Sequence, residues 1–169
     1  MNLALFQSVW LINIIGASSG NEWLGIISLL IFILIHSLIS TTYKVDFKLA
    51  ALAIIFGLII ETLIIQSNLL AYLNGFYSNE LAPLWLLCLW ANLALTFNGC
   101  LSWLNNRYLL GGFLGAIGAP LSYYAGITLG AATVESSLML SLSVIAVIYG
   151  AIIPIFLLIN KKLSQHCYS

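Results

Sequence analysis

Charged side chains are almost absent from this chain, which has five basic and five acidic residues among 169, or 6%, while 62% of its residues are hydrophobic. A soluble domain is about 25% charged. Ten charged side chains cannot cover the surface of a water-soluble fold of this length. We therefore expect an integral membrane protein that forms a single domain over residues 1–169. The zero formal net charge argues against nucleic acid as a partner.

Long apolar runs separated by short polar turns predict the membrane-spanning segments. A transmembrane helix needs roughly 20 mostly apolar residues. Six segments approach this length, which predicts an all-α bundle of six transmembrane helices. They cover residues 3–17, 23–40, 47–66, 81–104, 108–129 and 138–160. A signal peptide needs a basic region before its apolar stretch, but no Lys or Arg precedes the first segment. We therefore expect this segment to be retained as a membrane span.

The basic residues predict the orientation. All five fall beside loops or tails on one side of a six-span arrangement, which by the positive-inside rule is the cytoplasm, together with both termini. They are Lys44, Lys48, Arg107, Lys161 and Lys162. The longest break, residues 67–80, is too polar for hydrocarbon, and its apolar side chains favour a half-helix resting on the membrane surface.

Small residues in the segment 108–129 predict close helix packing. They repeat at four-residue spacing in two sets, which are Gly111, Gly115 and Ala119, and Gly118, Ser122, Gly126 and Gly130. Such grooves let another backbone approach. We therefore expect this helix at the centre of the bundle, and the second set could dock a second copy or another membrane protein.

Buried polar residues fall into two layers when they are placed by a helical rise of about 1.5 Å per residue. The layer on the cytoplasmic side holds Gln7, His36 and Asn98, and the outer layer holds Asn13, Glu61 and Tyr123. Only one acid, Glu61, lies within a predicted segment. Ionisable groups in membranes are costly and usually mark function, so Glu61 is the main site candidate, with Tyr123, Tyr124 and Asn13 as its expected partners.

Structural explanations compete for the other residues. Interhelical hydrogen bonds of Gln, Asn and His contribute about 0.6 kcal/mol each, so Gln7, Asn13, His36 and Asn98 either bind a ligand or only join helices. Likewise, Trp90 either packs in the core or lines a ligand cavity. His36, His166 and the three cysteines have no metal-ligand spacing. We therefore expect neither a metal nor a cofactor.

Motifs along nearly the whole chain carry a resemblance to a known family. They are Phe6-Gln7-x-x-Trp10, Trp23-Leu24-Gly25, His36, Gly57 with Glu61, Pro83-Leu84-Trp85, Leu89-Trp90, Thr96-x-Asn98, Trp103-Leu104, Gly115-Ala116, Pro120-Leu121-x-Tyr123 and Leu129-Gly130-Ala131. The chain resembles small bacterial inner-membrane proteins catalogued only as a domain of unknown function. The resemblance implies a multi-pass protein of the inner membrane, and it brings no established activity.

Three functions fit these observations. The first is an enzyme or enzyme accessory that acts on a lipid-phase substrate, with Glu61 as general acid or base and Tyr123 orienting it. The second is a proton-coupled carrier, for which the two polar layers would be stations and Pro120 and Pro154 would break helices. The third is an assembly subunit docked through the fifth segment. We rank the enzyme or accessory first and expect membrane lipid around the protein in every case.

Overall fold

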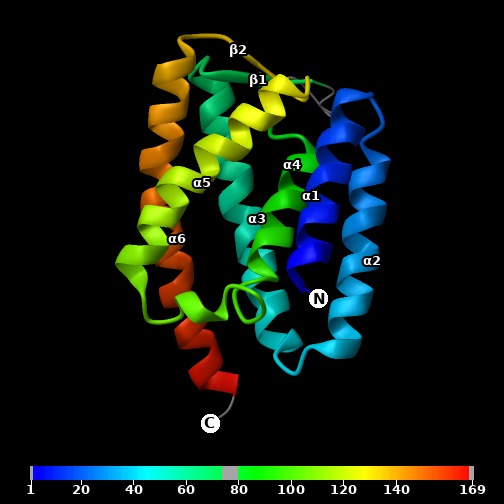
Figure 1. Ribbon diagram of the computed structural model, residues 1–169, viewed down its shortest axis with the longest axis vertical. Helices are drawn as coiled ribbons and strands as arrows, with labels where there is room; N and C mark the ends of the chain where they lie inside the picture. The colour runs from blue at the N-terminus through cyan, green and yellow to red at the C-terminus, as the bar shows by residue number, and fades with distance from the viewer. Residues whose placement is uncertain (1, 74–79, 168–169) are drawn as a thin grey trace.

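The computed structural model describes residues 2–73 and 80–167 (Figure 1). Its helices and strands are α1 (Asn2–Ser18), α2 (Trp23–Ile39), α3 (Tyr43–Gln66), β1 (Leu70–Tyr72), α4 (Leu84–Ala94), the 3-10 helix η1 (Ser102–Leu104), α5 (Tyr108–Thr128), β2 (Ala132–Val134) and α6 (Leu138–Cys167). The all-α prediction is confirmed, because the two strands are only three residues long.

Three of the helices in the described part of the chain are long and apolar enough to cross a membrane. These are α3, α5 and residues Leu138–Gln165 of α6. The apolar stretches of α1, α2 and α4 are shorter, at 10 to 17 residues. Length and composition thus support three of the six predicted spans.

The fourth predicted span, 81–104, is wrong as a continuous helix. α4 ends at Ala94, and the chain then turns before η1. Its eleven residues extend only about 16 Å at 1.5 Å per residue. The turn that ends α4 is held by Asn98, whose side chain donates to Asp46 of α3 and pairs with Asn160 of α6.

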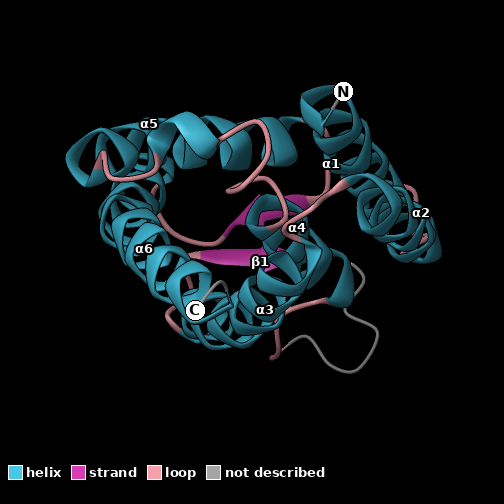
Figure 2. Ribbon diagram, turned by 90° about the horizontal axis from the view of Figure 1, so that it is seen from below, coloured by secondary structure: helices cyan, strands magenta, loops and turns pink. Residues whose placement is uncertain are grey.

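The prediction that residues 108–129 form the central helix is also wrong. α5 packs mainly on α6 and lies at the edge of the bundle, whereas α4 contacts α1, α2 and α3 (Figure 2). The expected close packing does occur on one face of α5. A Cβ added at Gly112 would lie 2.7 Å from the Gly150 carbonyl oxygen, and one added at Gly115 would lie 2.6 Å from the Tyr149 carbonyl oxygen.

The half-helix expected over residues 67–80 is not seen in residues 67–73, the described part that follows α3 directly. Its described part contains β1, which pairs antiparallel with β2 in the register Leu70 to Val134 and Tyr72 to Ala132. Residues 74–79 lie outside the described residues. The pairing turns Tyr72 back toward the end of α3.

Candidate functional site

Glu61 is fully buried near the end of α3, and its carboxyl group accepts hydrogen bonds from four side chains. Tyr72 Oη lies 2.7 Å from Glu61 Oε2, and Trp90 Nε1 lies 2.9 Å from Oε1. Tyr123 and Tyr149 donate their hydroxyls to Oε1, and these two hydroxyls lie 3.0 Å apart. We call these five residues the Glu61 cluster.

The members of the Glu61 cluster come from α3, β1, α4, α5 and α6, so the carboxyl group ties together elements that are distant in sequence. All four partners are uncharged. Phenol oxygens can accept as well as donate a hydrogen bond. The cluster can therefore hold the carboxyl group with or without its proton, which is the property that general acid–base chemistry needs.

Gly57 explains how Trp90 reaches the acid. A Cβ added at Gly57 would lie 2.6 Å from Trp90 Cγ, so the indole ring rests against the backbone of α3. Glu61 lies one helical turn further along, on the same face as Gly57. The spacing Gly57-x-x-x-Glu61 thus provides both the flat surface for the ring and the acceptor for its N–H.

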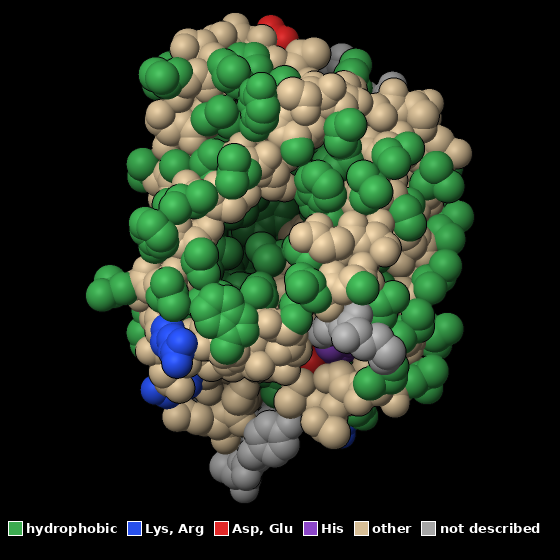
Figure 3. All heavy atoms as spheres, in the orientation of Figure 1, with side chains coloured by type: hydrophobic (Ala, Val, Ile, Leu, Met, Phe, Trp, Pro, Cys, Tyr) green, Lys and Arg blue, Asp and Glu red, His purple; other side chains and the backbone are tan. Residues whose placement is uncertain are grey.

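A cavity of about 610 Å³ adjoins the Glu61 cluster. It lies between α1, α4 and α5, and Figure 3 shows it as a hollow among hydrophobic side chains on the face between α5 and α1. None of the described residues that line it is charged. Its volume falls within the range of about 300–1,000 Å³ that is typical of small-molecule sites.

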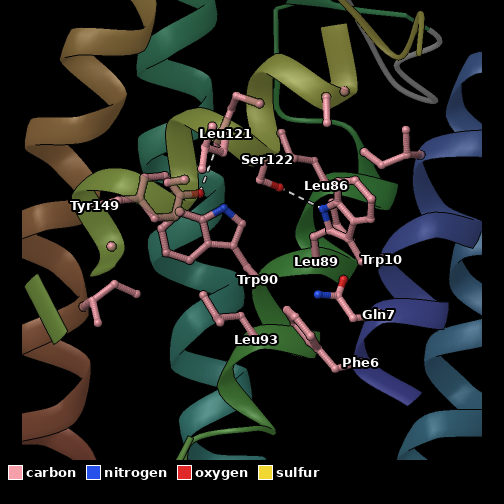
Figure 4. Close-up of a pocket in the computed structure, with 18 of the residues that line it drawn as sticks. Phe6, Gln7, Trp10, Leu86, Leu89, Trp90, Leu93, Leu121, Ser122 and Tyr149 are labelled. Carbon is pink, nitrogen blue, oxygen red and sulfur yellow. Dashed lines mark hydrogen bonds between the residues drawn. The ribbon is translucent and has the colours of Figure 1, made fainter. Parts of the chain in front are cut away.

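Glu61 itself does not line this cavity, although the other four members of its cluster do. The side chains of Trp90 and Tyr149 lie at the cavity in Figure 4, where a dashed line also joins Trp10 on α1 to Ser122 on α5. The aromatic side chains of the cluster thus separate the buried carboxyl group from the cavity. Any direct contact with a ligand would fall to Tyr123 or its neighbours.

A second polar cluster, which we call the Asp46 cluster, lies near the start of α3. Asp46 is fully buried, and its Oδ2 lies 2.8 Å from His36 Nε2 and from Thr42 Oγ1, and 3.0 Å from Ser40 Oγ. Asn98 Nδ2 donates to Oδ1 at 2.7 Å. His36 and Asn98 were predicted at the same depth in the bundle, and both contact Asp46.

Asn160 on α6 extends the Asp46 cluster. Its side-chain amide pairs reciprocally with that of Asn98, at 2.8 Å in each direction, and donates to Asn105 Oδ1 at 3.3 Å. The chain between α4 and α5 is therefore fastened to α3 and α6 by amide groups. This cluster is best explained as a structural junction of α2, α3, α6 and the turn after α4.

Two of the expected partners of Glu61 lie elsewhere. Asn13 is fully buried but donates to Val9 O at 2.8 Å within α1, and a Cβ added at Gly25 would lie 2.1 Å from its Oδ1. Asn13 therefore belongs to the close contact between α1 and α2. Tyr124 is 48% exposed and is not among the four side chains that donate to Glu61 in the described part of the chain. Only Tyr123 makes the expected contact.

The other predicted residues lie along the cavity. Gln7 is exposed and lines it, apart from His36 and Asn98, so the expectation of a three-residue layer is wrong. Trp90 lines the cavity as well as packing in the core. Gly118, Ser122 and Gly126 of the second small-residue set also line this space, and a Cβ added at Gly118 would meet nothing within 4 Å.

Sequence reasoning missed Asp46, Tyr72, Tyr149 and Asn160. Asp46 was assigned to a loop, but α3 begins at Tyr43, which places Asp46 in its first turn. The spacing of 15 residues between Asp46 and Glu61 puts both on the inward face of one helix and could have revealed it. Nothing local marks the two tyrosines, because their role depends on where β1 and α6 lie.

Replacement of Asp46 by alanine should lower the free energy of unfolding by about 3 kcal/mol, because His36 and Asn98 would lose their buried acceptor. Denaturant titration of the purified protein in detergent, followed by tryptophan fluorescence, measures this loss. Lys44→Ala, at an exposed position two residues earlier, is the control and should change stability little. Equal stability of the two variants would contradict the junction role.

Comparisons with known proteins place this site in a family. No curated protein and no solved structure matches the chain. A family model described as a protein of unknown function, DUF2878, matches residues 1–155. This range includes the whole Glu61 cluster and every residue that lines the cavity. Because the match covers nearly the full length, the chain belongs to the DUF2878 family.

Proposed function

We propose that this protein binds a lipid-phase molecule in the cavity between α1, α4 and α5 and acts on it as an enzyme or enzyme accessory. The observation that carries the proposal is the uncharged cavity of about 610 Å³ backed by the Glu61 cluster. An apolar molecule dissolved in the bilayer could enter from the side, since the hollow lies on the hydrophobic face between α5 and α1 (Figure 3).

The setting we propose is a single-domain, multi-pass protein of the bacterial inner membrane with six spans and both termini in the cytoplasm. The basic residues support this orientation: Lys44 and Lys48 lie at the start of α3, Arg107 precedes α5, and Lys161 and Lys162 lie near the end of α6. These three places are at the same end of the bundle (Figure 1). The short helices α1, α2 and α4 would then lie within the bilayer beside the three long ones.

Catalysis, in this proposal, involves Tyr123 at the cavity and Glu61 behind it. The Tyr123 hydroxyl donates to Glu61 and its side chain lines the cavity, so it can take a proton from a bound molecule while it passes its own proton to the carboxylate. Glu61 is then a positioning residue and proton store. A lipid extract incubated with purified protein tests this: Tyr123→Phe should abolish any conversion that the unmodified protein catalyses, and identical lipid profiles with and without protein would exclude the enzymatic role.

The carrier function receives less support. Asp46 and Glu61 are separated by about 22 Å along α3 at 1.5 Å per residue. Between the two clusters, Phe156 packs against Trp90 of the Glu61 cluster and against Phe97, the neighbour of Asn98 in the Asp46 cluster. A continuous polar path between the two acids is therefore absent from the described residues. A proton flux into proteoliposomes that requires both Asp46 and Glu61 would support the carrier function instead.

The assembly function also ranks lower, because the second small-residue set of α5 faces the cavity and a partner helix there would have to enter the cavity. This face remains available to a second copy or another membrane protein only if the cavity is empty of lipid.

Filling the cavity tests the binding proposal. In Gly118→Leu, the new side chain enters open space, since nothing lies within 4 Å of an added Cβ. We expect this variant to fold and to lose several-fold in photolabelling by a diazirine-bearing alkane added to phosphatidylcholine vesicles. Mass spectrometry of the labelled peptides measures the yield at α1, α4 and α5.

Ala151→Leu is the matched control, because Ala151 is exposed on α6 and does not line the cavity. It creates the same leucine side chain outside the cavity and should leave labelling unchanged. Equal labelling of the Gly118→Leu variant and the unmodified protein would contradict the binding proposal.

A further inference from the structure

The hydroxyl of Ser122 is the polar group that indicates which molecule the cavity accepts. Ser122 lies on α5, is half-buried and lines the cavity. Trp10 Nε1 on α1 donates to its oxygen at 2.8 Å (Figure 4). This bond joins two helices that otherwise flank the hollow, and it fixes the position of the hydroxyl group.

Three other hydroxyl side chains in the helices of this protein donate their proton to the backbone, although Thr62 on α3 only accepts a hydrogen bond. Ser28 donates to Gly25 O at 2.8 Å, Ser37 to Leu34 O at 2.7 Å, and Thr128 to Ala125 O at 2.9 Å. This back-bonding is the common way to satisfy a hydroxyl group within a helix. Among the contacts of the described residues, Ser122 has no such bond and only accepts. Its proton therefore has no acceptor among the residues that the structure describes.

The depth of Trp10 and Ser122 along their helices limits which molecule can accept the Ser122 proton. Trp10 lies eight residues before the end of α1, or about 12 Å, and Ser122 lies six residues before the end of α5, or about 9 Å. Ester groups of phospholipids stay at the membrane surface, outside the hydrocarbon core of about 30 Å. The acceptor must therefore belong to a molecule whose polar group enters the hydrocarbon region.

The lining excludes a charged headgroup. No described residue of the cavity wall is charged, and an unpaired ion in such a place is very costly. Gln7, three residues before Trp10 on the same face of α1, also lines the cavity and adds an uncharged polar group (Figure 4). The cavity thus combines apolar walls with neutral hydrogen-bonding groups.

We propose that the cavity binds an uncharged lipid that carries a carbonyl acceptor, and that Ser122 donates its hydroxyl proton to that carbonyl while Trp10 holds the hydroxyl in place. This inference rests on the proposed function and names the class of its ligand. A ketone or a quinone ring on a long apolar chain has the required chemistry, and a pure hydrocarbon lacks it.

Two photoreactive probes of equal chain length test this inference, one with a mid-chain ketone and one with a methylene group at that position, each carrying a diazirine. They are added to the full-length protein in phosphatidylcholine nanodiscs, and mass spectrometry measures labelling at the cavity. We expect the ketone probe to label more strongly. In Ser122→Ala, labelling by the ketone probe should fall by about fivefold, the effect of one net hydrogen bond, while labelling by the hydrocarbon probe stays unchanged.

Two further variants separate the hydroxyl effect from general damage. Ser37→Ala removes an exposed hydroxyl that already donates to the backbone, and it should change neither probe. Trp10→Phe should lower the ketone preference as Ser122→Ala does, because Ser122 becomes free to donate to its own helix.

The outcomes are distinct. If both probes label the cavity, and each labels the unmodified protein and the Ser122→Ala variant equally, the carbonyl inference is overturned. Lipid binding in the cavity would then still stand. If neither probe labels the cavity, the proposed function itself is overturned.

Discussion

Replacement of Glu61 by alanine is expected to lower the free energy of unfolding by about 4 kcal/mol. Tyr123 and Tyr149 can still bond to each other, but the Trp90 N–H and the Tyr72 O–H would lose the carboxyl group as their acceptor. Each buried donor left unsatisfied costs about 1–3 kcal/mol. Unfolding of the detergent-solubilised protein by a denaturing detergent, followed by tryptophan fluorescence, measures the change.

Glu61→Gln tests whether the loss comes from the missing acceptor or from the missing volume. Glutamine keeps one oxygen for Trp90 and fills nearly the same space, so it should lose about half as much stability. Glu135→Ala is the matched control, because this acid is exposed in the turn after β2. A loss in Glu61→Ala no larger than in Glu135→Ala would show that the cluster does not hold the helices together.

The second large effect is expected at the contact between α5 and α6. In Gly112→Leu, the Cβ would lie 2.7 Å from the Gly150 carbonyl oxygen and 3.1 Å from Pro154 Cγ. Backbone and proline atoms cannot rotate away as a flexible side chain does, so the two helices must separate. Overpacking costs about 1–3 kcal/mol and occasionally more, and here we expect about 3 kcal/mol, measured as above.

Gly118→Leu provides the comparison, since the same substitution occurs six residues later in the same helix. It meets no atom within 4 Å, and replacement of a helical glycine is intrinsically favourable by about 1 kcal/mol. The two variants therefore separate close packing from helix propensity. Similar stability of both would mean that α5 does not approach α6 closely.

Patterns within single segments predicted the helical class and the membrane character of this protein. Runs of apolar residues specify helices that can be buried in lipid, and four-residue spacing of glycines specified one close contact, which α6 makes with α5. The depth of Glu61 and Tyr123, counted along their own helices, was sufficient to predict that they meet. These properties follow from helical rise and period alone.

The same reasoning failed wherever position depended on a partner helix. Asn13 has the depth of Glu61 but faces α2, because depth along a helix does not specify rotation about its axis. α4 is short because the chain turns where Asn98 donates to Asp46 of α3 and to Asn160 of α6, and hydropathy does not report such contacts.

The sequence by itself determined that this chain forms apolar helices and that the carboxyl group of Glu61 lies deep inside, because hydrophobicity and helical period are local properties. Only the tertiary structure decided that Tyr72, Trp90 and Tyr149 surround Glu61 and that an empty space lies beside them. Cavities and hydrogen-bond partners arise where the surfaces of distant segments meet, and lipid, unlike water, leaves buried polar groups to find their partners within the protein.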